Sequence, residues 1–360
     1  MMKCATCQTL CAVFLRGTTR AVAVWDQNGI FFKDPPHDEG WTMQRECLVR
    51  AADGTQIYSS SQGEGPPLIL CDGIGCDGFI WRYIRETFAD RHTIIHWNYR
   101  GHGLSHRPKN IDDLDMAVLC DDLRAVMDAH DVDTAVLLGH SMGVQVILQF
   151  ALTHPGRVQG LVPICGSYGR PLDTFRDNSY ASKVFPILKK MVLKAPKIAK
   201  RVVQMACKSG LAYAIATRTD VNGRLIRPDD FKPYFEHLAA MDPEIFVRML
   251  AYLAAHSVEE RLGEINTPTL VMAGEQDTFT PSWLSHRMHH LIADAELLLV
   301  PTGTHVAPIE IPELVELRLN KFLSERVYSV GAQQAAPHSH RAPRAKRKHG
   351  AASRAATVAM

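Results

Sequence analysis

The chain has 360 residues, of which 46% are hydrophobic and 22% are charged, and these proportions are typical of a globular protein with a full core. The formal net charge is +2, but the last thirty residues hold six Lys/Arg and no acid, which leaves 34 basic against 38 acidic residues elsewhere. The small positive net charge therefore does not indicate nucleic-acid binding. No apolar run approaches the roughly 20 residues that a membrane span needs.

Nine cysteines are scattered along the chain, and their odd number favours reduced thiols over a disulfide framework. Cys4, Cys7 and Cys11 stand close together at the start, but no fourth ligand with metal-site spacing accompanies them. The same stretch is a poor signal peptide, because its apolar run is short and interrupted. We therefore expect a cytoplasmic protein with no metal, in which residues 1–40 form a poorly ordered N-terminal extension.

Apolar strands and amphipathic helices begin to alternate near residue 41. Asp53-Gly54 joins two β runs in a hairpin, and the short apolar runs that follow suit strands buried on both faces of a parallel sheet. The expected strands lie at 45–52, 56–60, 68–71, 92–97, 134–138 and 158–165, and the expected helices at 79–88, 114–130 and 142–154. This spacing predicts an α/β protein with a doubly wound, mostly parallel sheet, and residues 41–165 form the first part of its core.

From residue 166 to residue 260 the pattern is helical only. The expected helices lie at 182–194, 195–208, 228–239 and 243–255, and we interpret the segment as a helical cap inserted into the sheet domain. The sheet pattern resumes over 261–328, with strands at 269–273 and 295–300 and helices at 281–292 and 311–326. Residues 329–360 have too little apolar surface to offset the cost of ordering, so we expect a basic, disordered tail.

The motif Gly139-His140-Ser141-Met142-Gly143 stands between an apolar strand and a helix. A sharp strand-to-helix turn raises a serine Oγ clear of the backbone at a helix N-terminus, as a nucleophile requires. Such a turn crowds its neighbours, so Gly139 and Gly143 stand where a Cβ would collide. The motif predicts Ser141 as a nucleophile, in a turn supported by these two glycines and His140.

A serine nucleophile needs a base, and the base needs an orienting carboxylate. In a doubly wound sheet such groups lie at the carboxyl ends of strands, where one loop carries Asp277 and the next carries His305. We predict His305 as general base and later general acid, and Asp277 as the carboxylate that fixes its tautomer. Two alternatives stay open. Glu275, on the same loop, could be the triad acid in place of Asp277, or Asp277 could simply cap the following helix.

Two backbone N–H groups are expected to hold the oxyanion of such a reaction. One is the N–H of Met142, and the other is that of Ile74, which lies in a glycine-rich loop where Gly73 allows close approach. The glycines of this loop also fit a dinucleotide-binding pattern. That pattern requires an acidic residue at the end of the second strand, and the chain has none there.

Together these motifs resemble the α/β-hydrolase superfamily, specifically its capped serine hydrolases, which include carboxylesterases, carbon–carbon bond hydrolases and haloperoxidase-like enzymes. The resemblance covers residues 45–324 and rests on four motifs: 72–75, 98–105, 139–143 and the paired loops of Asp277 and His305. It implies the α/β-hydrolase fold, the same triad and oxyanion donors, and a cap that shapes the substrate pocket. Asp72 and Asn98 depart from the residues common in the family, and Asp72 raises the question of how the oxyanion loop packs.

We therefore expect a serine hydrolase that cleaves an ester or related acyl bond of a small molecule or lipid, through an acyl-enzyme and without a cofactor. Carbon–carbon bond hydrolysis of a diketone-like substrate and a cofactor-free haloperoxidase-like activity are alternatives, because the same triad serves them. A non-catalytic ligand receptor on the same fold is a third, against which the intact triad argues.

Residues 182–201 carry seven Lys/Arg interleaved with apolar side chains. A basic amphipathic face could make a weak contact with a membrane surface or bind an acidic substrate. We favour a solvated lysine face over a buried apolar stripe. His286, His289 and His290 lack an accompanying carboxylate, so we interpret them as a helix surface and not as a metal site.

Overall fold

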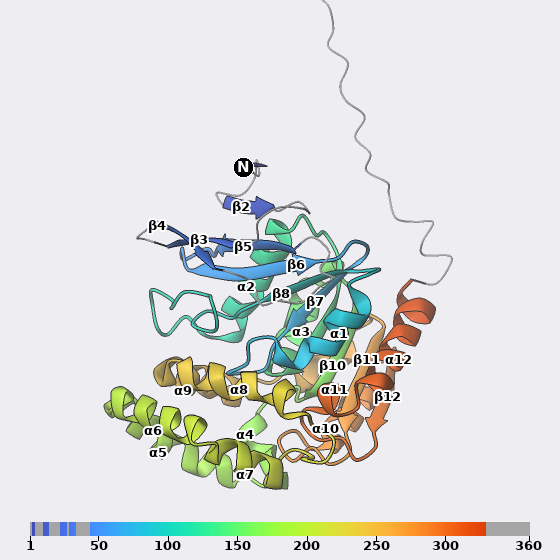
Figure 1. The fold of residues 1–360 in the computed structure, drawn as a ribbon. Helices are drawn as coiled ribbons and strands as arrows, with labels where there is room; N and C mark the ends of the chain where they lie inside the picture. Colours follow the sequence, from blue (N-terminus) through green and yellow to red (C-terminus); the bar gives the residue numbers. More distant parts are fainter. Residues whose placement is uncertain (1, 4–9, 14–21, 27–28, 34–43, 329–360) are drawn as a thin grey trace, which may run out of the picture.

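One mixed sheet runs through the molecule, with helices on both of its faces (Figure 1). The computed structural model describes residues 2–3, 10–13, 22–26, 29–33 and 44–328, in which the strand order is β1-β2-β5-β6-β8-β7-β9-β10-β11-β12. Its eight main strands are β5 (Gln44–Arg50), β6 (Gln56–Gln62), β7 (Pro67–Cys71), β8 (Thr93–Trp97), β9 (Ala135–Ser141), β10 (Val158–Gly166), β11 (Thr269–Gly274) and β12 (Ala295–Val300). β5 and β6 pair antiparallel, whereas all pairs from β8 to β12 are parallel. The predicted mostly parallel sheet is confirmed.

The central strands are buried on both faces because their side chains alternate between two cores. In β9, Ala135 and Leu137 belong to one buried cluster, and Val136 and Leu138 belong to the other. The first cluster also contains residues of α2 (Met116–Ala129), α3 (Met142–Thr153) and α10 (Ser282–Leu291). The second contains residues of α1 (Arg82–Phe88), α11 (Ala307–Glu310) and α12 (Pro312–Phe322). Continuous apolar runs in the sequence therefore became strands of a doubly covered sheet.

A helical segment stands between β10 and β11. Its helices are α4 (Pro171–Thr174), α5 (Tyr180–Lys194), α6 (Pro196–Lys208), α7 (Leu211–Thr219), α8 (Pro228–Ala240) and α9 (Pro243–Ala255). α5 packs on α9 and α6 packs on α8, so α5, α6 and α7 form the outer layer (Figure 1). An antiparallel bridge between Gly169 and Ser257 joins the two ends of the segment.

The structure departs from expectation at α5 and α6. Neither helix has a buried residue. Four members of the apolar stripe that we expected to be buried are exposed: Val184, Ile187, Leu188 and Met191. Both helices carry apolar residues on the side that packs inward as well as on the outer side, and α8 and α9 cover only the inner side. The buried-stripe interpretation is therefore wrong.

Four short strands occupy parts of the stretch before residue 41: β1 (Met2–Lys3), β2 (Leu10–Val13), β3 (Val22–Asp26) and β4 (Gly29–Lys33). β1 and β2 extend the main sheet beside β5, and β3 pairs with β4. The remainder of the expected N-terminal extension and the expected tail at 329–360 lie outside the described residues. Within the described ranges, no helix is both long and apolar enough to cross a bilayer.

The start of α3 lies against the end of β7 so closely that only glycine fits between them. A Cβ built on Gly143 would lie 2.0 Å from the carbonyl oxygen of Cys71, and one on Gly139 would lie 2.4 Å from the carbonyl oxygen of Gly143. Both obstacles are backbone atoms, which cannot rotate away. The crowding predicted for this turn is confirmed at both glycines.

Replacing Gly143 with alanine is therefore expected to cost at least about 2 kcal/mol of unfolding free energy, because the added methyl must displace the backbone. Gly156 provides the matched control, since a Cβ there meets nothing within 4 Å. Gly156→Ala should change stability by less than about 1 kcal/mol. Urea unfolding of the two variants measures the difference, and equal midpoints would contradict the close approach.

Candidate active site

Ser141 lies at the junction of β9 and α3, where sequence predicts the nucleophile. Its backbone has φ 53° and ψ −113°, a conformation that non-glycine residues adopt only under strain. The N–H of Met142 is the first of α3 and points out of the helix without an intrahelical acceptor. The turn thus brings together a partly exposed serine hydroxyl and an available N–H donor.

Asp277 and His305 lie in the loops that follow β11 and β12, and their side chains are in contact. The Nδ1 of His305 lies 2.9 Å from Oδ2 of Asp277. Asp277 is buried, and its other oxygen accepts the N–H groups of Phe279 and Thr280 at 2.8 and 2.9 Å. Glu275, the alternative acid, is exposed. Asp277, and not Glu275, is therefore the carboxylate in contact with the His305 ring.

The surroundings of Asp277 favour its ionised form. Burial alone would raise the pKa of this carboxyl, but the His305 ring and the hydrogen bonds of Thr280 outweigh burial and hold the pKa below its ordinary value. The bonds to Phe279 and Thr280 turn the loop back on itself, and the N-cap residue of α10 is Pro281. Asp277 therefore organises its own loop and does not cap α10.

Two contacts bring His305 beside the Ser141 turn. The Nε2 of His140, the residue before Ser141, donates to the His305 carbonyl at 2.8 Å, and the two rings lie 5.0 Å apart. Phe279 stacks on the His305 ring, with ring centroids 4.9 Å apart. The Ser141 hydroxyl makes no hydrogen bond to His305 or to any other residue of the described ranges. The structure thus joins the two loops while the serine–histidine bond itself stays unformed.

The loop after β7 supplies the second predicted oxyanion donor. A Cβ built on Gly73 would lie 3.1 Å from the Ser141 Cβ, so this loop passes directly beside the serine. The N–H of Gly75 donates to Nε2 of His102 at 3.1 Å. The N–H of Ile74 has no acceptor among the residues that the structure describes. Gly73 therefore lies beside the serine, and the role of the Ile74 N–H as an oxyanion donor stays a prediction.

Asp72, one of the two departures from the family pattern, holds this loop in place. Its buried carboxylate accepts hydrogen bonds from Trp81 Nε1 at 2.7 Å and the Gly78 N–H at 3.0 Å, and it lies 2.8 Å from His96 Nε2. Burial alone would raise the pKa of Asp72, but the His96 ring, Trp81 and Gly78 lower it below its ordinary value. The carboxylate thus stabilises the loop from within. The other departure, Asn98, accepts the Leu104 N–H at 3.0 Å.

Sequence reasoning missed Glu310, which ties the histidine loop to the helical segment. Its carboxylate accepts the N–H and the hydroxyl of Thr304, both at 2.7 Å, and the N–H of Asn222 at 2.7 Å. Burial raises the pKa of Glu310. The only signal in the sequence is a charged residue in the otherwise apolar start of the last helical stretch. Many surface helices show the same pattern, so this signal does not identify the role of Glu310.

No group of three or more His, Cys, Asp or Glu side chains in the described part of the chain is arranged to hold a metal ion. The arrangement around Ser141 therefore provides a hydroxyl, an oriented imidazole, a buried carboxylate and two unpaired N–H donors. These groups suit acyl transfer.

Comparison with known proteins identifies the family. The model of the alpha/beta hydrolase fold family matches residues 66–312, which is more than half of the chain. The chain belongs to the α/β-hydrolase family. The resemblance inferred from the motifs is confirmed, and the protein is an enzyme of this family.

Several relatives of this α/β-hydrolase are themselves hydrolases. A putative carbamate hydrolase, RutD, of Azorhizobium caulinodans is 26% identical over 272 residues, which cover 75% of this chain and 95% of the relative. An esterase from Exiguobacterium antarcticum has a TM-score of 0.61 at 20% identity, covering 76% of this chain and 98% of its own. An enol-lactonase from Burkholderia xenovorans has a TM-score of 0.64 at 18% identity, and the match covers 78% of this chain and 100% of the lactonase chain. At these identities the two structures are evidence for the shared fold alone.

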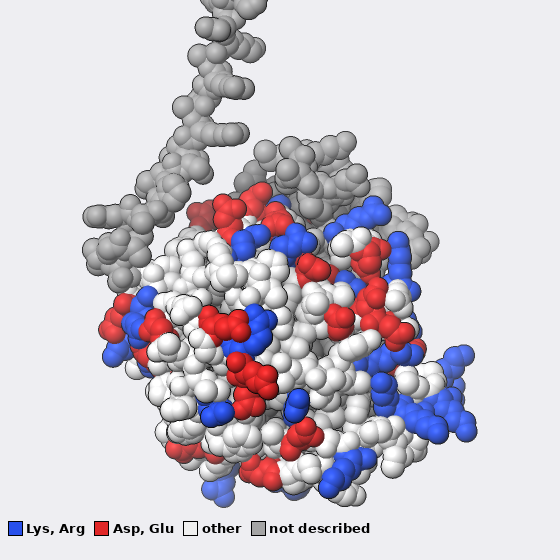
Figure 2. All heavy atoms as spheres, turned by 180° about the vertical axis from the view of Figure 1, so that it is seen from behind, with Lys and Arg blue, Asp and Glu red and all other residues white. Residues whose placement is uncertain are grey.

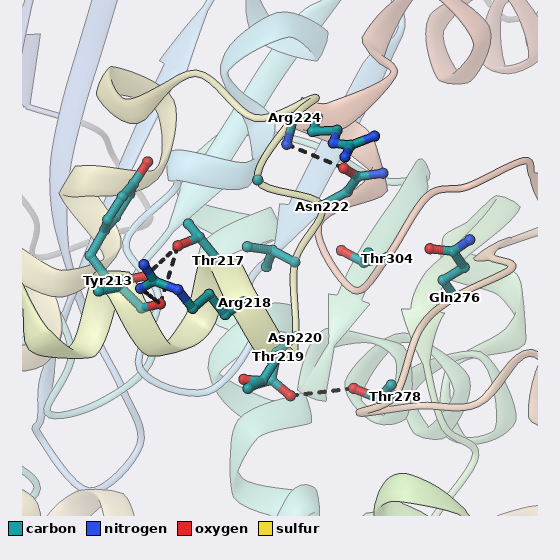
Figure 3. A pocket seen from close by; sticks show the side chains of 13 residues that line it. Tyr213, Thr217, Arg218, Thr219, Asp220, Asn222, Arg224, Gln276, Thr278 and Thr304 are labelled. Carbon is teal, nitrogen blue, oxygen red and sulfur yellow. Dashed lines mark hydrogen bonds between the residues drawn. The ribbon is translucent and has the colours of Figure 1, made fainter.

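A cavity of about 900 Å³ lies beside the candidate site of the hydrolase (Figure 3). One wall comes from α7 and the loop after it, including Thr217 and Arg218, and the other from Gln276 and Thr304. These last two residues are chain neighbours of Asp277 and His305, but neither Asp277 nor His305 lines the cavity, and nor does Ser141. We therefore regard it as a neighbour of the site and not as the acyl pocket.

The Asp72 network generates a prediction about acid stability. Because the folded state holds the pKa of Asp72 below its ordinary value, the stabilisation is complete above the unfolded pKa of about 4 and is lost as pH falls through the folded pKa. Asp72→Asn leaves the buried His96 without its partner, so it should lower stability at pH 7 by about 3 kcal/mol or more. The difference from the original enzyme should narrow as pH falls below 4.

Denaturant unfolding at a series of pH values measures this effect. Asp121, an exposed carboxylate paired only with Arg124 on the surface, supplies the control, and Asp121→Asn should follow the original enzyme at every pH. Equal stability of the Asp72→Asn variant and the original at pH 7 would contradict a structural role for the network.

Proposed function

We propose that this α/β-hydrolase cleaves an ester or related acyl bond through an acyl-serine intermediate. Ser141 is the nucleophile, His305 is the general base and Asp277 orients the histidine. The observation that carries the proposal is the 2.9 Å contact between His305 and Asp277, in a loop that His140 ties to the serine turn. In unliganded enzymes catalytic hydrogen bonds are often long or poorly aligned, so the unformed bond between Ser141 and His305 is compatible with this role.

Attack by Ser141 Oγ on the carbonyl carbon transfers the hydroxyl proton to His305 Nε2 and produces a tetrahedral oxyanion. The N–H groups of Ile74 and Met142 donate to this oxygen, and the ionised Asp277 stabilises the imidazolium. His305 then protonates the leaving group, and the acyl-serine remains. A water molecule activated by His305 attacks the acyl-serine and releases the acid, which restores the hydroxyl of Ser141.

We infer that the segment 166–260 acts as the cap and contributes the apolar side of the substrate pocket. A Cβ built on Gly75 in the oxyanion loop would lie 3.2 Å from Phe246 of α9 and 3.5 Å from Leu238 of α8. These two side chains, with Phe279 on His305, border the place where an acyl or leaving group would sit. The pocket therefore favours a substrate with an apolar portion next to the reacting carbonyl.

The named relatives suggest which acyl bonds to test first. RutD of Azorhizobium is a putative carbamate hydrolase, and other neighbours are an esterase and an enol-lactonase. A panel of a carbamate, a short ester, a long-chain ester, a lactone and a vinylogous diketone separates acyl hydrolysis from carbon–carbon bond hydrolysis, which the same triad would also serve. Turnover slower than about one event per hour on every substrate would favour the receptor alternative, because typical enzyme rates are far higher.

The nucleophile assignment predicts covalent labelling. A fluorophosphonate probe should label the enzyme at Ser141, and Ser141→Ala should abolish the label, because the probe reacts only with an activated serine. Ser324→Ala, at an exposed helical serine, is the control and should label like the original enzyme. Absence of labelling in the original enzyme, or equal labelling after Ser141→Ala, excludes the proposal.

The carboxylate assignment predicts unequal effects at two acids on one loop. Asp277→Asn should lower kcat by about 10⁴-fold with little change in KM, because the amide no longer holds the productive tautomer of His305. Glu275→Gln should leave kcat within about twofold, since Glu275 is exposed and does not contact His305. Steady-state kinetics on the best substrate of the panel measures both. A larger loss for Glu275→Gln would reassign the acid.

A further inference from the structure

Exposed apolar side chains gather on the outer face of α5, α6 and α7. Ten of the fourteen large hydrophobic residues exposed in the described ranges lie between residues 180 and 215. They recur at helical spacing, so each helix turns one apolar stripe to the outside. Members of these stripes include Tyr180, Ile187 and Met191 on α5 and Ile198, Val202 and Met205 on α6. Ile187, Met191, Ile198 and Met205 are each 63–64% exposed, a degree of exposure that a monomeric soluble protein seldom gives to a whole stripe.

The same three helices are strongly basic. Residues 180–219 contain nine Lys/Arg and no acidic residue. None of the nine has a carboxylate within ion-pair distance among the residues that the structure describes. Exposed members such as Lys190, Lys194, Lys197 and Arg201 flank the apolar stripes. Figure 2 shows a group of Lys and Arg side chains that projects at the lower right, where α5 and α6 lie, with no acidic side chain among them.

We propose that this outer face of α5–α7 docks the enzyme on an anionic lipid bilayer. Apolar stripes flanked by lysine and arginine fit the boundary between acyl chains and headgroups, where the stripes are buried and the cations meet lipid phosphates. A second copy of the chain fits less well. In a two-fold contact the same patch meets itself, and its lysines and arginines would face one another without an anion between them.

Docking in this orientation would bring the cavity beside the site close to the lipid headgroups. α7 turns Leu211 and Ile215 outward, whereas Thr217 and Arg218 of the same helix line the cavity. One helix therefore has both a membrane-facing stripe and a cavity wall. The proposal does not depend on the triad, because it concerns a surface away from Ser141.

Sedimentation with sucrose-loaded vesicles tests the proposal on the full-length protein. The protein should pellet with phosphatidylcholine vesicles that contain about one third phosphatidylglycerol, and it should remain in solution with vesicles of phosphatidylcholine alone. Salt at about 1 M, where the Debye length falls to about 3 Å, should release the protein from the anionic vesicles. Replacing Lys190, Lys194, Lys197 and Arg201 with glutamine should lower the partition coefficient by about several hundredfold, at roughly fivefold for each cation. Ser141→Ala should pellet like the original enzyme, so failure of the triad and failure of docking are distinguishable.

A second variant tests the apolar stripes: Ile187→Ser, Met191→Ser and Met205→Ser together should also reduce pelleting. Leu317→Ser is the matched control, since Leu317 is 68% exposed on α12, away from the patch. The basic residues at 341–348 are present in every variant and so do not contribute to the differences. The proposal is overturned if the original enzyme does not pellet, if the glutamine variant pellets equally, or if light scattering finds a dimer that the serine substitutions separate.

Discussion

The hydrogen bond from the His140 ring to the His305 carbonyl joins the two loops on which the candidate site depends. The first loop is fixed by the close approach of α3 to β7, and the second is held by Glu310. Burial and, to a smaller extent, the nearby His305 ring lower the pKa of His140 to about 4, so the His140 ring is neutral at physiological pH. A neutral ring can donate from Nε2 to the carbonyl without placing a second positive charge beside a protonated His305. The contact therefore holds the two loops together without a second charge beside the His305 ring.

The features that could be predicted from the sequence are those with local physical causes. Strands such as β7 and β9 followed from short apolar runs, because a strand covered on both faces has no polar side to display. Gly139 and Gly143 followed from the steric demands of a strand-to-helix turn. Asp277 and His305 could be predicted to meet because parallel strands end at one edge of the sheet, although sequence left Glu275 as an alternative. In the structure Asp277 is buried in contact with His305, whereas Glu275 is exposed.

Contacts between distant segments could not be predicted in the same way. Asp72 takes its partners from Gly78, Trp81 and His96, and nothing in the local pattern indicates that a carboxylate should be buried there with an imidazole. The outer face of α5–α7 shows a related limit. Periodicity identifies an apolar stripe, but it does not specify whether another part of the fold covers that stripe. Because α5 and α6 have apolar residues on two sides, covering one of them still leaves the other in contact with solvent.

The bridge between Gly169 and Ser257 has a further consequence for how this enzyme can vary. Around it, the Arg170 N–H donates to the His256 carbonyl at 2.9 Å and the Val258 N–H donates to the Tyr168 carbonyl at 3.0 Å. The chain thus leaves the sheet after β10 and returns before β11 through one narrow, hydrogen-bonded neck between neighbouring strands. Loop-closure entropy rises only slowly with length, so the polypeptide beyond such a neck can lengthen, shorten or be replaced without changing strand order. The helical segment can therefore diverge between descendants of one ancestor while Ser141, Asp277 and His305 stay where they are.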